Sequence, residues 1–242
     1  MAYIEHEFYL TIRDIDKNTN MTNKAILTFF EDVGGMHSDI AGYGLKQIDE
    51  SRISWILLNW KVQVLKRIKY DGKPIKVKTW SRGAIRACTY RDFELYNSDG
   101  DLCVIGTSKW TLFNLDTGLM RLTDEIISKY SSESKSVFGE FEFKKLHEPE
   151  QYLSVYDYTV SRRDVDINSH MHNLYYLDIA YDTLPKDVYE NNSFDNVEIM
   201  YKKEAKLYDN LKCFYSNIDN EHIVTIKSED EKTLHAIVKL SI

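Results

Sequence analysis

A polar cluster at 163–173 holds the residues of this sequence best suited to chemistry. Asp166, Asn168 and His170 alternate, so an extended backbone would turn all three side chains to one face. That face would hold a hydrogen-bond acceptor, an amide and a base that titrates near neutrality. Apolar residues follow at helical spacing, so the cluster would lie at the start of a helix, where unpaired N–H groups favour developing negative charge. These apolar residues are Leu174, Leu177, Tyr181 and Leu184.

The same pattern occurs once before, at 13–23, at a constant offset of 150 residues. Six of the eleven aligned pairs are identical. His170 corresponds to Asn20, so the first copy lacks the titratable base. A helical pattern and strand-like runs follow each copy, which indicates that the repeated unit is a whole domain. The sequence therefore predicts two copies of one fold, one of them without the base.

A long buried helix and a set of strands are expected around the first copy of the pattern, at 13–23. Apolar residues mark one helix face from Thr22 to Ile40, and Gly42-Tyr43-Gly44 closes the pattern. Asp99-Gly100 favours a hairpin turn because these residues tolerate positive φ. Strands are expected at 3–12, 54–68, 75–80, 86–96 and 102–115.

The stretch 131–150 lacks clean periodicity and is the best linker candidate. We therefore expect an N-terminal domain at 1–130 and a C-terminal domain at 151–242. Strands of the second domain are expected at 151–161, 196–206, 211–216, 222–228 and 233–241. The predicted class is α+β, with a helix against an antiparallel sheet in each domain.

Composition limits the range of partners and cellular settings. With a net charge of −7 and pI ≈ 5.5, the chain has no general attraction to nucleic acid or anionic membranes. Its three cysteines show no metal-ligand spacing and favour a reduced, cytoplasmic setting. We expect a soluble, unprocessed protein, because the N-terminus lacks signal-peptide features and no apolar run approaches the roughly 18 residues of a membrane span. Neither a metal nor a redox cofactor is expected.

The motifs resemble the acyl-ACP thioesterases over nearly the whole chain. In the second half the resemblance rests on 163–173, Tyr175-Tyr176 and Pro185. The first-half motifs are Ile12-Arg13, Glu31-Asp32-Val33, His37, Gly42 to Gly44, Trp55, Lys78-Thr79-Trp80 and Thr107-Ser108-Lys109-Trp110. This resemblance implies two tandem hotdog domains, each a long helix wrapped by a curved antiparallel sheet. It also implies hydrolysis of fatty acyl-[acyl carrier protein] to free fatty acid and holo-ACP in fatty acid biosynthesis.

The resemblance also implies roles for particular residues. In the family, a glutamate on the strand after the helix follows a Tyr-basic-basic sequence, and Tyr201-Lys202-Lys203-Glu204 matches it. Glu204 would hold or activate water, Asn168 would position water or the thioester oxygen, and His170 would orient that amide or exchange a proton. Asp166 would fix the His170 tautomer and cap the helix, although it could be a capping residue only.

Two departures sharpen this interpretation. The family places a cysteine directly after the glutamate, but this chain has Ala205, which excludes an acyl-cysteine there and favours a Glu-activated water. Aligning Tyr208 with Tyr70 sets Lys66 opposite Glu204, so the first half lacks both candidate bases. We expect one active site per chain, with the N-terminal domain helping to build the acyl-chain groove.

Acyl carrier protein is acidic, so docking should use basic residues near the site, of which Arg163 and Lys202 are the candidates. Two alternatives remain open at this stage: a hotdog thioesterase acting on acyl-CoA, and a non-catalytic acyl-binding sensor. A hotdog 3-hydroxyacyl dehydratase is a weaker candidate, because it would not need the pattern of Asp166 and Asn168. Hotdog units usually pair, and the tandem could satisfy this within one chain or form a homodimer.

Overall fold

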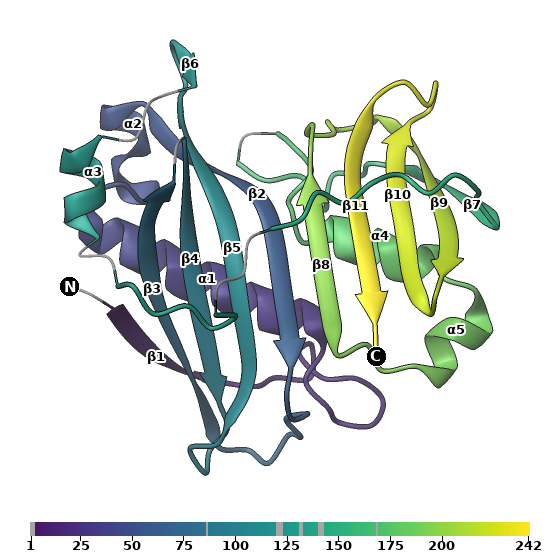
Figure 1. Ribbon diagram of the computed structural model, residues 1–242, viewed down its shortest axis with the longest axis horizontal. Coiled ribbons are helices and arrows are strands. Elements are labelled where there is room, and N and C mark those ends of the chain that lie inside the picture. The colour runs from purple at the N-terminus through teal and green to yellow at the C-terminus, as the bar shows by residue number, and fades with distance from the viewer. Residues whose placement is uncertain (1–2, 86, 120–122, 131–132, 140–142, 168) are drawn as a thin grey trace. The chain divides into compact units, whose positions relative to one another are not determined.

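The computed structural model describes residues 3–85, 87–119, 123–130, 133–139, 143–167 and 169–242. They belong to two compact units (Figure 1). The first unit comprises 1–58 and 62–142, and the second comprises 59–61 and 143–242. In each unit a helix packs against an antiparallel sheet, which confirms the predicted α+β class.

The first unit arranges its main strands in the order β1-β3-β4-β5-β2, with the short β6 paired to β5. Helix α1 contacts β1 and β3 on one face of this sheet (Figure 1). The elements are β1 (Tyr3–Tyr9), α1 (Asn23–Ala41), η1 (Leu45–Gln47), α2 (Ile48–Ser51), β2 (Ile53–Val64), β3 (Pro74–Ile85), β4 (Cys88–Tyr96), β5 (Leu102–Asn114), β6 (Gly118–Leu119) and α3 (Asp124–Lys129).

Helix α1 begins and ends where its capping residues dictate. The Thr22 side chain accepts a hydrogen bond from the Ala25 N–H at 3.1 Å, and Gly42 takes the left-handed conformation at φ 85°. Phe30, fully buried on the helix, stacks on Phe93 of β4 with ring centroids 4.6 Å apart. The helix predicted from Thr22 onward is thus confirmed, and its apolar face forms the core of the first unit.

The second unit repeats the plan with shorter elements, in the strand order β8-β11-β10-β9-β7. Helix α4 contacts β7, β9, β10 and β11 (Figure 1). It ends before Pro185, because the residue preceding a proline is driven to an extended conformation, which Leu184 adopts at ψ 143°. The elements are β7 (Ser154–Thr159), α4 (Tyr175–Thr183), α5 (Lys186–Asn191), β8 (Asn196–Tyr201), β9 (Asn210–Ile218), β10 (Glu221–Ser228) and β11 (Leu234–Ser241).

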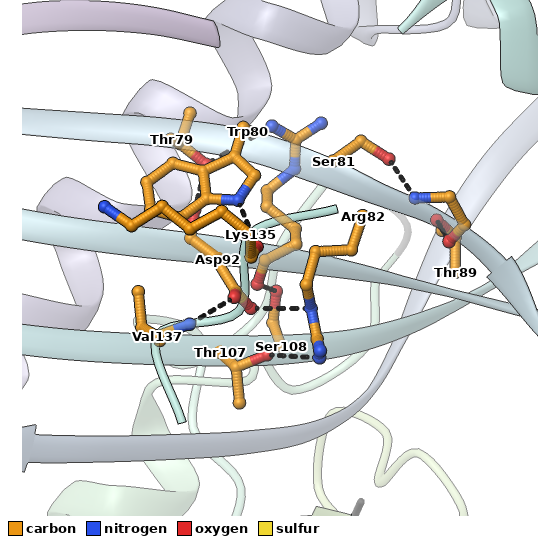
Figure 2. A network of polar contacts seen from close by, with 12 residues as sticks. Thr79, Trp80, Ser81, Arg82, Thr89, Asp92, Thr107, Ser108, Lys135 and Val137 are labelled. Carbon is orange, nitrogen blue, oxygen red and sulfur yellow. Dashed lines mark hydrogen bonds and ion pairs between the residues drawn. The ribbon is translucent and has the colours of Figure 1, made fainter. Parts of the chain in front are cut away.

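Part of the stretch predicted to be a linker is held against the first sheet, as Figure 2 shows. The Trp80 indole N–H donates to the Lys135 carbonyl at 2.9 Å, and the Val137 N–H donates to the Asp92 carboxylate at 2.9 Å. Asp92 is fully buried and also pairs with Arg82 at 3.1 Å. Residues 133–139 are therefore fixed to the first unit by buried polar contacts.

The expected strands are present, with ends that shift by a few residues. The short helices α2, α3 and α5 lack an amphipathic repeat long enough for sequence patterns to detect. Two predicted ends are wrong by five residues: the strand expected at 75–80 extends to Ile85, and the strand expected at 196–206 ends at Tyr201. Among the described residues, no helix combines the length and the apolar character needed to cross a bilayer.

Candidate active site

The polar cluster folds into a tight turn and not the extended face that the alternation predicts. The Ser169 N–H donates to the Asp166 carbonyl at 3.0 Å, and Ser169 has a φ of 60°. The Asp166 N–H donates to the His170 carbonyl at 2.8 Å, so the chain reverses between these two residues. The prediction of an extended backbone was wrong because local hydrogen bonds of Asp166 close the turn.

Asp166 acts through the backbone of the turn. Its Oδ1 accepts the His170 N–H at 3.2 Å. Helix α4 has Leu174 at its N-cap with no side-chain cap, so the expectation that Asp166 caps the helix was wrong. Asn168, the third member of the predicted group, lies outside the described residues.

Glu204 lies on an irregular segment that follows β8 and not on the strand itself. The ladder with β11 continues only as far as the Lys202 N–H, which donates to the His235 carbonyl at 2.8 Å. Beyond this point the Lys203 carbonyl is bonded at 2.8 Å by the His235 side chain instead. The predicted strand ends early because the His235 side chain, and not the next backbone group of β11, bonds the Lys203 carbonyl. The residues after Lys203 therefore leave the sheet.

The released segment pairs with the turn. Met171 donates its N–H to the Ala205 carbonyl at 2.8 Å, and His170 forms an isolated antiparallel bridge with Lys206. Glu204 therefore lies on a segment hydrogen-bonded to the one that carries His170, although the two are 34 positions apart in the sequence. Within the described residues, no hydrogen bond joins the side chains of His170 and Glu204, so a bridging group would be needed to couple them.

Two buried side chains fix the Glu204 segment: Tyr176, which the motif includes without indicating this contact, and His235, which no sequence pattern singled out. The Tyr176 hydroxyl accepts the Ala205 N–H at 3.0 Å, and both residues are buried. Burial raises the pKa of Tyr176 to about 12, and the nearby Glu204 charge adds to the shift. His235, on β11, is 5% exposed and bonds the Lys203 carbonyl as described above. Glu204 itself is exposed on a backbone held from both sides.

The first unit repeats this turn and identifies the true counterpart of Glu204. Asp16 donates its N–H to the Asn20 carbonyl at 2.8 Å, and Thr19 has a φ of 64°, as in the second turn. Met21 donates to the Ile68 carbonyl, as Met171 does to Ala205. Ile68 thus corresponds to Ala205, and the preceding residue, Arg67, corresponds to Glu204.

The prediction that Lys66 lies opposite Glu204 was therefore wrong by one residue, since the connection to Tyr70 differs in length from that to Tyr208. The Arg67 Nη1 donates to the Asn23 side-chain oxygen at 3.2 Å. An arginine thus stands where the second unit has a carboxylate, and Asn20 stands where it has His170. The first unit lacks both candidate bases, as expected.

The charged residues near the turn are the buried Asp164 and the exposed Arg163 and Lys202. Burial alone would raise the pKa of Asp164, but hydrogen bonds from Tyr158 and Ser161 and the charge of Arg163 outweigh it and lower that pKa. Arg163 and Lys202, the predicted docking residues, are both exposed. The hydrogen bond to Tyr158 and the charge of Asp164 raise the pKa of Arg163, so its positive charge is retained.

The environment of Cys213 does not favour nucleophilic chemistry. Cys213 is fully buried, and burial raises the pKa of its thiol to about 12. Cys213 is therefore a small residue of the core. No group of His, Cys, Asp and Glu that could hold a metal ion is found in the described part of the chain.

Two family models match the chain in order. The model for the acyl-ACP thioesterase N-terminal domain matches residues 2–130, and that for the C-terminal domain matches 147–240. The chain belongs to the acyl-ACP thioesterase family. The resemblance inferred from the sequence motifs is thereby confirmed, and the turn with its Glu204 segment falls in the part of the chain that the C-terminal domain model matches.

Curated relatives include plant enzymes. Oleoyl-acyl carrier protein thioesterase 1, chloroplastic, of Arabidopsis thaliana is 23% identical over 224 residues, which cover 85% of this chain and 61% of that protein. Palmitoyl-acyl carrier protein thioesterase, chloroplastic, of Gossypium hirsutum is 23% identical over 172 residues, covering 68% of this chain and 41% of the relative. The chain thus spans about three fifths of the length of the Arabidopsis protein.

Solved structures of similar fold cover the whole chain. An acyl-ACP thioesterase from Bacteroides thetaiotaomicron superposes with a TM-score of 0.86 at 22% identity, covering 99% of this chain and 97% of that one. The 12:0-ACP thioesterase from Umbellularia californica gives 0.84 at 16% identity, with coverage of 100% and 97%. These likenesses confirm the hotdog fold.

Proposed function

We propose that this chain hydrolyses the thioester of fatty acyl-[acyl carrier protein], releasing free fatty acid and holo-ACP in fatty acid biosynthesis. The observation that carries the proposal is the match of both domain models of one thioesterase family, in order, at 2–130 and 147–240. The arrangement of the second unit supports it, since the turn and the Glu204 segment are joined by backbone hydrogen bonds.

In the proposed reaction, Glu204 accepts a proton from the attacking water. The exposure of Glu204 leaves its carboxylate accessible to water, and its backbone is held by buried groups. Hydroxide adds to the thioester carbonyl as the proton moves to Glu204, and collapse of the tetrahedral intermediate expels the pantetheine thiolate, which takes up a proton. We assign to His170 the exchange of a proton with the water or the leaving thiol.

Asn168 is proposed to position the water or the carbonyl oxygen, as the family motif implies. Its neighbour Asp166 acts indirectly in the proposal, by closing the turn through the His170 N–H. A preformed turn would stabilise the transition state without reorganising during the reaction. Because Asn20 and Arg67 occupy the equivalent positions in the first unit, the proposal includes one active site per chain.

Acyl carrier protein is the proposed partner, docking through Arg163 and Lys202. Both side chains are exposed on a chain whose net charge is −7, so a local basic patch would be needed to attract an acidic carrier. The proposed setting is cytoplasmic, which the free thiols of Cys88, Cys103 and Cys213 support. The proposal requires neither nucleic acid nor a membrane, and light scattering would detect a homodimer.

The test compares thiol release from acyl-ACPs and matching acyl-CoAs over a range of chain lengths. We expect the wild type to turn over acyl-ACP. Reversing the charges of Arg163 and Lys202 together should raise the KM for acyl-ACP. Preference for acyl-CoA, with no effect of these substitutions, would show that the chain hydrolyses thioesters but that its substrate is carried by CoA and not by acyl carrier protein. Tight binding of acyl groups without thiol release from either substrate would overturn the enzymatic function.

A further inference from the structure

The peptide groups on both sides of Glu204 are bonded by buried side chains. His235, on β11, is 5% exposed, and its Nδ1 bonds the Lys203 carbonyl at 2.8 Å. Tyr176, on α4, is 2% exposed, and its hydroxyl accepts the Ala205 N–H at 3.0 Å. The first contact therefore acts on the peptide group immediately before Glu204, and the second acts on the peptide group immediately after it.

Fixing these two peptide groups fixes the direction of the glutamate side chain. Each peptide group is planar, so the backbone at one residue has only two free rotations, φ and ψ. The plane before Glu204 contains the Lys203 carbonyl, and the plane after it contains the Ala205 N–H. When both planes are held, φ and ψ of Glu204 are set, and the direction of its Cα–Cβ bond is set with them. The exposed carboxylate thus extends from a fixed position.

The contact of His235 requires a proton on one particular ring nitrogen. A carbonyl oxygen only accepts hydrogen bonds, so Nδ1 must be the donor. This nitrogen lies two bonds beyond Cβ. The amide nitrogen of an asparagine lies at the same two bonds from Cβ, whereas a leucine has a similar branched shape and no donor. The contribution of the donor can therefore be separated from that of packing.

The first unit, which lacks both candidate bases, also lacks this histidine. The Leu65 N–H donates to the Cys103 carbonyl at 2.8 Å, as the Lys202 N–H does to the His235 carbonyl at 2.8 Å. Leu65 and Lys202 are equivalent, because each stands two positions before the residue at the site of the base. The backbone bonds therefore place Cys103 where the second unit has His235.

Cys103 uses its side chain differently. Its thiol, a weak donor, bonds the Asp101 carbonyl at 3.3 Å, in the turn that precedes β5. Lys66, the counterpart of Lys203, is bonded through its backbone N–H to the Cys103 carbonyl at 3.0 Å. The histidine donor thus belongs to the unit that contains Glu204, and it is replaced in the unit where the carboxylate is replaced.

We propose that His235 is a positioning residue of the active site, which holds the peptide group before Glu204 through its Nδ1–H and so directs the carboxylate toward the attacking water. Strand β11 lies between β8 and β10 in the sheet, so the backbone of His235 is itself well supported. A base held in this way does not have to be reoriented during the reaction. The inference rests on the proposed role of Glu204, through which His235 acts.

The test compares His235→Asn with His235→Leu in thiol release from acyl-ACP. Both substitutions place a branched side chain of similar size in the core, but only asparagine supplies the N–H. We expect kcat to fall about 10- to 100-fold in His235→Leu, the order of effect when a catalytic group is misplaced by ~1 Å, with little change in KM. His235→Asn should recover most of this loss and keep the pH profile of the wild type, because it restores the donor.

The matched control is His222→Leu. His222, on β10, is 7% exposed, and its Nδ1 bonds the Tyr215 hydroxyl at 2.8 Å, a contact that involves no residue of the Glu204 segment. This variant should lose thermal stability and keep its kcat. An equal loss of kcat in His222→Leu and His235→Leu would overturn the proposal. Equal kcat in His235→Asn and His235→Leu would also overturn it, because the donor would then make no difference.

One measurement needs no variant. Long-range proton–nitrogen NMR correlation of the wild type shows which ring nitrogen of His235 carries the proton. We expect a proton on Nδ1. A proton on Nε2 alone would overturn the proposal, even if neither variant folds.

Hydrogen exchange tests the contact without turnover. The Met171 N–H donates to the Ala205 carbonyl at 2.8 Å, so its exchange with deuterium reports on the Glu204 segment. We expect faster exchange in His235→Leu than in His235→Asn, and equal rates would contradict the contact. This difference in exchange, without thiol release by the wild type, would refute the thioesterase function and not the contact. The two proposals can therefore fail independently.

Discussion

Replacing Tyr176 with Phe removes one oxygen and tests how the Glu204 segment is held. The Tyr176 hydroxyl accepts the Ala205 N–H at 3.0 Å, and the two residues are 2% and 0% exposed. The substitution leaves a buried N–H without a partner, which costs about 1–3 kcal/mol. For a chain of this length, each kcal/mol lowers the melting temperature by about 2–4 °C.

The same loss should reach catalysis, because Ala205 adjoins the proposed base. If the lost hydrogen bond misplaces Glu204 in the transition state, kcat falls by about 5- to 150-fold while KM changes little. The Tyr176 pKa of about 12 keeps its hydroxyl protonated, so the pH profile of kcat below pH 9 should retain its shape.

The matched control is Tyr215→Phe. Tyr215 is also buried in the second unit, and its hydroxyl bonds the His222 Nδ1 at 2.8 Å, a contact that involves no residue of the turn or of the Glu204 segment. The control should lose similar thermal stability and keep its kcat. An equal loss of kcat in both variants would refute a positioning role, since it would trace the effect to general destabilisation.

Further predictions concern the cores of both units. The Cys213 thiol, with its pKa raised to about 12 by burial, should resist iodoacetamide at pH 8 in the native protein and react once unfolded. Asp164→Asn should cost about 1–3 kcal/mol of unfolding free energy above pH 4, because the Ser161 N–H donates to this carboxylate at 2.6 Å. The pKa of Asp164 is lower in the folded than in the unfolded state, so the stability that its carboxylate contributes is lost as the pH falls through the folded-state pKa. Urea unfolding below pH 4 should therefore show a smaller difference in unfolding free energy between the wild type and Asp164→Asn. Gly106→Ala should cost about 1–3 kcal/mol, because its Cβ would lie 2.5 Å from Phe30, and a melting temperature equal to the wild type would contradict this.

Local chemistry made much of the fold predictable. Thr22 and Gly42 bound the first helix as their side-chain and backbone preferences dictate. The repeat of 13–23 at 163–173 predicted two similar turns, and their hydrogen bonds do correspond. In both cases the information lies within a few neighbouring residues.

The turn at 166–170 and the contacts between distant segments were not predictable from patterns. The alternation of Asp166 and His170 suggested a strand, but hydrogen bonds between these two residues and the left-handed conformation of Ser169 close a turn. The end of β8 depends on His235, a residue 32 positions beyond Lys203 in the chain. The first-unit counterpart of Glu204 could be identified only from the backbone hydrogen bonds. The loops that lead to Tyr70 and Tyr208 differ by one residue in length, so the counterpart is Arg67 and not Lys66.

Single-turnover thiol release from acyl-ACP by Glu204→Gln shows whether Glu204 is the base. This substitution keeps the size of the side chain and removes its ability to accept a proton. Glu229→Gln, which changes an exposed glutamate of the same unit, is the control. We expect the rate to fall by about 10²–10⁴-fold in Glu204→Gln and to be unchanged in the control. A rate within about twofold of the wild type for Glu204→Gln, with substrate still bound, would contradict it.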